Sequence, residues 1–109
     1  MRMMITADGF NLTETLRDNV RREIGRFVQA TNRPVNMVSV HLVDERGRAV
    51  RGRDKLCRVR VGFGDDDFEL EENDAEARFD ASVSEAFVKI MRAVPRLRQN
   101  ATRHLARAS

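Results

Sequence analysis

Two stretches near the middle of the chain alternate apolar and polar side chains, and this pattern constrains the fold more than any other feature. In residues 35–43 and 55–63 every second side chain is apolar, as in Val38, Val40 and Leu42. A period of two is typical of strands that bury one face. The sequence also predicts shorter strands at residues 3–7 and 68–71. The side chains expected on the solvated face of the sheet are Ser39, His41, Arg58, Arg60, Glu69 and Glu71.

Two segments with helical periodicity accompany these strands. Between Thr13 and Ala30 the apolar residues recur every three or four positions, and either Asn11 or Thr13 can cap the helix. A second helix is predicted to begin at Asn73, because Asn73 and Glu76 have the spacing of a capping box. Its apolar stripe comprises Phe79, Val83, Phe87, Ile90, Val94, Leu97, Ala101 and Leu105.

The predicted order β-α-β-β-β-α indicates an α+β fold, with a four-stranded sheet and two helices packed on one face, as in double-stranded-RNA-binding domains. Pro95 interrupts the second helix. A proline inside a helix removes a hydrogen bond and costs about 3 kcal/mol, so the helix is expected to kink there or to end and restart. We expect residues 1–109 to form a single domain, with residues 95–109 as a basic, helical C-terminal extension.

Composition and chain length exclude several classes of protein. The chain has 109 residues, 41% of them hydrophobic and 34% charged, which is typical of one globular domain. No run of about 18 apolar residues occurs, so no membrane partner is expected. The first apolar stretch is too short for a secretion signal, and the single Cys57 cannot form an internal disulfide. A cytoplasmic protein is therefore expected.

Positive charge gathers at the C-terminal end of the chain. Residues 86–109 contain six cations and no acidic residue. On a helical wheel five of the six lie within about 60°, opposite the apolar stripe. Such a row without counter-charges suits a phosphate backbone, although many charged helix faces are simply solvated. The five cations are Lys89, Arg92, Arg96, Arg103 and Arg107.

Other charged segments are more ambiguous. The first helix adds Arg17, Arg21, Arg22 and Arg26, but three intervening acidic residues can pair with them as ordinary surface ion pairs. Residues 44–55 hold five cations and three acids, and this loop is a further candidate for partner contact. Residues 65–74 are acidic. A solvated turn and a charged edge strand explain this segment better than a metal site, because its spacing is not that of a known calcium loop.

The sequence gives little support for catalysis. The candidate side chains are Cys57, His41 and His104, but alternation places Cys57 on the inner face of the sheet and His41 on the outer face. We therefore expect no enzyme, no small-molecule substrate, no cofactor and no metal. The chain has no Trp or Tyr, so it lacks the aromatic platform on which single-stranded nucleic acids stack. Folded RNA is the better match.

Residues 38–47 and 54–59 resemble the strand–loop–strand unit of the short bacterial ribosome hibernation-promoting factors, the HPF/RaiA family of ribosome-associated inhibitors. Residues 12–20 and 83–92 are similar to the two helices of that family. The resemblance implies a non-catalytic factor that binds ribosomal RNA of the small subunit, in the channel for messenger and transfer RNA. It implies inhibition of translation during starvation or stationary phase. The RNA contacts that it implies come from Arg17, Arg21, Lys89, Arg92 and Arg96.

Two positions depart from the family pattern: Pro95 stands where a helix former is expected, and Asp80 where an aromatic residue is common. Two alternatives therefore stay open. The chain could recognise another structured RNA, or it could be a protein-interaction module whose acidic edge and long apolar stripe serve a weak homodimer or an acidic protein partner.

Overall fold

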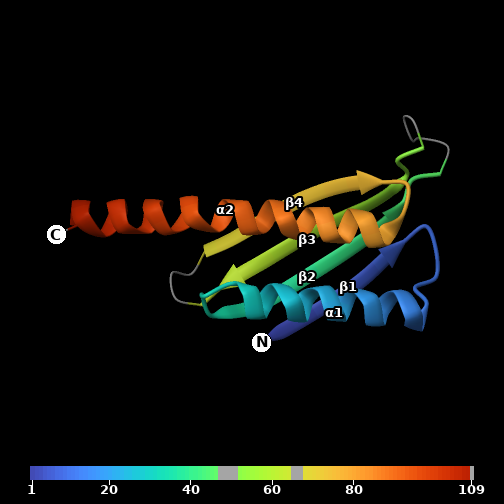
Figure 1. Ribbon diagram of the computed structural model, residues 1–109, viewed down its shortest axis with the longest axis horizontal. Helices are drawn as coiled ribbons and strands as arrows, with labels where there is room; N and C mark the ends of the chain where they lie inside the picture. Colours follow the sequence, from blue (N-terminus) through green and yellow to red (C-terminus); the bar gives the residue numbers. More distant parts are fainter. Residues whose placement is uncertain (47–51, 65–67, 109) are drawn as a thin grey trace.

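The computed structural model describes residues 1–46, 52–64 and 68–108, with side chains in the last helix only as far as Val94. The observed order is β-α-β-β-β-α, so the predicted α+β class is confirmed (Figure 1). The elements are β1 (Arg2–Asp8), α1 (Glu14–Ala30), β2 (Val35–Asp44), β3 (Lys55–Phe63), β4 (Phe68–Glu76) and α2 (Phe79–Ala108).

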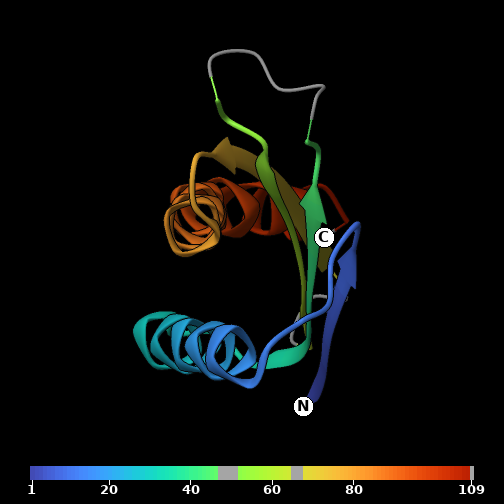
Figure 2. The ribbon, with the colours of Figure 1, turned by 90° about the vertical axis from the view of Figure 1, so that its right-hand side faces the viewer.

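The four strands form one mixed sheet in the spatial order β1-β2-β3-β4. β1 and β2 are parallel because α1 connects them, whereas the other neighbouring pairs are antiparallel. Figure 2 shows both helices on the same face of the sheet, as the sequence predicts. α1 packs against β2, and α2 packs against β3 and β4. The opposite face of the sheet is not covered by either helix.

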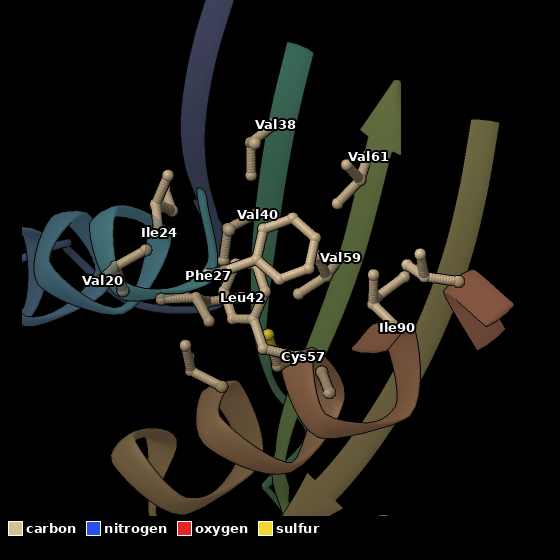
Figure 3. Close-up of a cluster of buried hydrophobic side chains, with 14 of the residues drawn as sticks. Val20, Ile24, Phe27, Val38, Val40, Leu42, Cys57, Val59, Val61 and Ile90 are labelled. Carbon is tan, nitrogen blue, oxygen red and sulfur yellow. The ribbon is translucent and has the colours of Figure 1, made fainter. Parts of the chain in front are cut away.

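The core lies between the sheet and the two helices (Figure 3). The alternation of β2 and β3 is confirmed, because their inward side chains are fully buried and Arg58 and Arg60 are exposed. The predicted stripe of α1 and the described part of the α2 stripe, as far as Val94, meet this layer, with Val20, Ile24 and Ile90 among the most buried residues. The inward strand residues are Val38, Val40, Leu42, Cys57, Val59, Val61 and Phe63.

The predicted start of the second helix is wrong. β4 continues to Glu76, and α2 begins at Phe79. Asn73 lies opposite Arg58 in the sheet and does not cap a helix. The reason is tertiary: β3 is nine residues long, and β4 pairs with all of it, from Phe63↔Phe68 to Lys55↔Glu76. A capping pattern is local, so it does not indicate whether a strand from elsewhere in the chain pairs with the same residues.

Pro95 does not end the second helix. α2 runs for 30 residues through this position, and Figure 1 draws it as one continuous helix that projects beyond the sheet. Helix formers such as Arg96, Leu97 and Gln99 follow Pro95, and their propensity offsets part of the cost of the missing hydrogen bond. Within the part of the chain that the structure describes, no helix has the length and apolarity to cross a membrane.

Candidate nucleic-acid interface

The four predicted cations of α1 are all exposed. The helix begins after Thr13, whose hydroxyl accepts a hydrogen bond of 3.2 Å from the Leu16 amide, so one of the two predicted caps is confirmed. Arg21 lies 3.7 Å from Asp18 in a pair whose side chains are both more than half exposed. Such pairs contribute about 0.2–1 kcal/mol at most, so Arg21 can leave Asp18 for a phosphate at little cost.

The remaining cations of α1 differ in their surroundings. Arg26 donates a 3.0 Å hydrogen bond to Glu23 one turn earlier. Arg17 and Arg22 have no ion pair with any residue that the structure describes. Arg22 and Arg26 line the space between the two helices, whereas Arg17 does not. α1 therefore presents positive charge both toward α2 and away from it.

Lys89 has a partner that the sequence pattern does not predict. Its ammonium group lies 3.0 Å from an Asp74 carboxylate oxygen and donates a 2.6 Å hydrogen bond to the backbone oxygen of Asn73. The Asp74 side chain is only 12% exposed. The expectation of a cation row without counter-charges is therefore wrong at Lys89. Because β4 extends to Glu76, it carries Asp74 beneath α2, where a helical start had been predicted.

Arg92 meets the expectation of an exposed cation. It is exposed and has no ion pair within the described part of the chain. Three further predicted cations belong to α2 beyond the last described side chain, so their contact with RNA stays a prediction. These three are Arg96, Arg103 and Arg107. The catalytic candidate His104 also lies beyond that side chain.

A groove lies between α1 and α2, and no pattern in the sequence predicts it. Its volume is about 360 Å³, and its lining is mostly apolar. The rings of Phe27 and Phe87 meet at its floor, with centroids 5.2 Å apart and planes tilted by 36°. Arg26 and Arg92 line it from opposite helices. We name this space the interhelical groove; its other lining residues are Glu23, Ala30, Ser84, Val88 and Met91.

The outer face of the sheet is balanced in charge. Arg58 lies 3.4 Å from Glu71, and Arg60 lies 3.7 Å from Glu69 and 3.9 Å from Glu71. His41 is hydrogen-bonded through Nδ1 to the hydroxyl of Thr6 at 2.6 Å. The acidic edge strand is thus paired largely with the chain's own cations, whereas residues 65–67 of the predicted acidic segment lie outside the described residues. This surface is less suited to phosphate than the helix face.

Asp44 organises the cations at the base of the β2–β3 connection. Its side chain is only 2% exposed and accepts hydrogen bonds from Arg46 at 2.7 Å and Lys55 at 3.0 Å. Burial raises the pKa of Asp44, but the bonds from Lys55 and Arg46 outweigh burial and leave the pKa below its ordinary value. Two of the five predicted loop cations, Arg46 and Lys55, are thus paired with a carboxylate of the chain itself. Residues 47–51 lie outside the described segments.

A family model described as sigma 54 modulation protein / S30EA ribosomal protein matches residues 3–102. The match spans nearly the whole chain, including nearly all of the four strands and most of α2. The chain belongs to this family. The resemblance to HPF/RaiA factors that the sequence shows is therefore confirmed.

Two solved structures share the fold of this S30EA-family chain. The N-terminal domain of Thermus thermophilus Protein Y has a TM-score of 0.68 at 16% identity, over 89% of this chain and 99% of its own. A ribosomal subunit interface protein from Coxiella burnetii has a TM-score of 0.71 at 10% identity, over 91% of this chain and 99% of its own. No curated protein sequence matches the chain significantly.

Two of the three side chains considered for catalysis, Cys57 and His41, are described by the structure of this S30EA-family chain, and they do not come together. Cys57 is fully buried on the inner face of β3, whereas His41 lies on the outer face of β2. Burial, with a further contribution from the charge of Asp74, raises the pKa of the Cys57 thiol to about 12. Among the described residues, no group of three or more His, Cys, Asp or Glu side chains has the arrangement of a metal site.

We expect Cys57 to resist thiol reagents in the native protein at neutral pH. Its thiol is buried and protonated, whereas the nucleophilic form of cysteine is the exposed thiolate. The measurement is the rate of reaction with an aromatic disulfide reagent, without and with urea. The rate should rise by orders of magnitude on unfolding. A native thiol that reacts as fast as the unfolded one would restore Cys57 as a candidate nucleophile.

Proposed function

We propose that this chain binds ribosomal RNA of the small ribosomal subunit through the face formed by α1 and α2, and thereby inhibits translation without catalysing a reaction. The site of action is the cytoplasm. Membership of the S30EA family supports an association with ribosomes, and one solved neighbour is itself a ribosomal subunit interface protein. Inhibition follows if the bound protein occupies space that messenger or transfer RNA needs.

The observation that carries this proposal is the distribution of charge between the two faces. On the helix face Arg17, Arg22 and Arg92 are exposed and have no ion pair among the described residues. On the sheet face Arg58 and Arg60 are paired with glutamates of β4. A cation that has no carboxylate partner in the protein gains the most binding free energy from a phosphate. It gives up no ion pair, and its binding releases counterions that are condensed on the RNA.

The projecting end of α2 enlarges this surface in our proposal. α2 continues beyond the sheet (Figure 1). We assign residues 95–109 as the basic extension of the ribosome-binding domain. In α2 the rise of 1.5 Å per residue spreads the four predicted cations that follow the paired Lys89, from Arg92 to Arg107, over roughly 22 Å. That length is enough for contact with several successive phosphates.

The protein should co-sediment with small ribosomal subunits and dissociate steeply as salt is raised. If about five phosphate contacts form, the slope of log K against log salt is about −4.5, and a fourfold increase in salt weakens binding by about 500-fold. Sucrose-gradient sedimentation in a salt series from roughly 50 to roughly 200 mM measures this slope. A cell-free translation assay tests the inhibition.

Protein that stays at the top of the gradient in low salt would refute subunit binding. The homodimer alternative makes a different prediction, since it buries an apolar stripe and does not depend on phosphate. Light scattering during size exclusion would then show a dimer that persists at high salt. Subunit binding together with a monomeric mass supports the proposal and rejects that alternative.

A further inference from the structure

We propose that the interhelical groove receives one unpaired RNA base, and that the phosphates beside this nucleotide contact Arg26 and Arg92. This inference rests on the proposed function, because it assigns a ligand to part of the same surface. It predicts that recognition is not purely electrostatic: one nucleotide leaves its stack and enters the space between α1 and α2.

The lining of the groove favours a small, flat, apolar group. Its volume of about 360 Å³ is at the small end of ligand pockets, which span roughly 300–1,000 Å³. Phe27 and Phe87 form the floor, and Met91 adds a flexible thioether that adapts to a planar ring. A helix from a protein partner would need an extended apolar surface, whereas a single base needs only this short segment.

The charges at the rim favour a nucleotide over an uncharged apolar ligand. Arg26 lies on the α1 side and Arg92 on the α2 side, so both walls present a guanidinium. Arg22 lines an adjoining hollow of about 210 Å³ whose charged lining is balanced, since Glu23 and Asp80 line it as well as Arg22 and Arg26. A nucleotide combines an apolar ring with anionic phosphates on either side, which is the arrangement that this groove complements.

Polar groups inside the groove favour a base with an exocyclic amino group. The Glu23 side chain is 28% exposed and lies in the groove wall, where it already holds Arg26 at 3.0 Å. A carboxylate accepts hydrogen bonds from the amino group of cytosine or of another base that carries one. Ser84 adds a hydroxyl from α2 that can donate or accept. Uracil, which has no amino group, is the least favoured occupant.

The test is chemical footprinting of small ribosomal subunits with dimethyl sulfate and kethoxal, which together modify unpaired adenine, cytosine and guanine. Wild-type protein should protect at least one such base. Ala30→Leu adds bulk to the groove from an exposed position of α1 and should abolish that protection. Affinity should fall by about fivefold or more, because the inserted base loses its apolar burial and its hydrogen bond to Glu23. The salt slope should be unchanged, because the phosphate contacts remain.

Gln29→Leu is the matched control, because it places a leucine at the neighbouring exposed position of α1, outside the groove lining. This variant should bind as wild type does. Ser84→Met fills the groove from α2 and provides a second test if Ala30→Leu lowers the unfolding temperature. Both filling variants should fail to protect the same base.

The outcomes separate this inference from the proposed function. If wild-type protein does not bind subunits, the proposed function itself fails. If wild type binds but the groove-filling variants keep both the footprint and wild-type affinity, the base-binding groove is rejected and the proposed function stands. Weaker binding of Gln29→Leu to the same extent would also reject the groove, because the effect would then come from added bulk on α1 in general.

Discussion

Replacing Arg92 with glutamate is expected to weaken binding to small ribosomal subunits by about tenfold or more in roughly 0.1 M salt. One phosphate contact changes the slope of log K against log salt by about 0.9, which corresponds to roughly tenfold at that concentration. Arg92 is exposed and has no ion pair among the described residues, so its full charge is available to RNA. The added negative charge of Arg92→Glu repels the phosphate as well. Titration of labelled protein with subunits over a salt series measures both effects.

Lys89→Met is the control for this prediction. It removes a cation three residues away on the same helix and keeps a long side chain there. Because Lys89 already pairs with Asp74 at 3.0 Å, its removal should change the affinity by less than about twofold. Its main effect should be on stability, by about 1–3 kcal/mol, because the Asp74 carboxylate is only 12% exposed and loses its cation. Equally weakened binding of Lys89→Met and Arg92→Glu would contradict the distinction between paired and unpaired cations.

The double variant Arg92→Glu, Arg96→Glu extends the same measurement into the C-terminal extension. If both arginines contact phosphate, the two effects multiply to a decrease in affinity of about 100-fold or more, which removes co-sedimentation in roughly 0.1 M salt. A double variant that binds no more weakly than Arg92→Glu would place Arg96 outside the RNA interface. The salt slope gives an independent measure, because its magnitude should fall by about one for each phosphate that the protein no longer neutralises.

The features that the sequence predicts correctly are those encoded by local periodicity. Val38, Val40 and Leu42 alternate with polar side chains, and alternation alone assigns them to the buried face of β2. The helical spacing of Val20, Ile24 and Phe27 assigns the inner face of α1 in the same way. With two one-sided helices and one half-apolar sheet, a two-layer arrangement follows, because each apolar face needs a partner.

The features that escape prediction depend on packing between distant segments. The sequence around Asn73 and Glu76 satisfies a helix-capping pattern, but pairing with β3 keeps this segment extended. The same pairing brings Asp74 to Lys89. The interhelical groove likewise depends on the spacing of two helices that are far apart in the chain, so no motif within either helix indicates it. Family likeness supplied the expectation of ribosome binding, which periodicity does not contain.

Ile90→Ala is expected to lower the free energy of unfolding by about 2–5 kcal/mol. Ile90 is fully buried in the core, on the face of α2 that packs against the sheet. The change removes apolar packing and leaves a cavity between helix and sheet that the rigid strands cannot close. Urea unfolding followed by far-ultraviolet circular dichroism measures the change, since the chain has no tryptophan for fluorescence. A domain of this size has a total stability of about 5–15 kcal/mol, so the decrease is a large fraction.

Ile90→Val is the matched variant, because it removes one methylene and should cost about 0.5–1.5 kcal/mol. The comparison also tests how α2 presents its cations. If the packing of α2 on the sheet fixes the direction of Arg92, then Ile90→Ala should weaken subunit binding even where the protein remains folded. Ile90→Val should not weaken it. Ile90→Ala could instead lower the free energy of unfolding by less than about 1 kcal/mol, well below the range for a buried isoleucine. That result would show that the packing of Ile90 on the sheet does not hold α2 in place. In that case the orientation of the basic face would have to come from RNA itself.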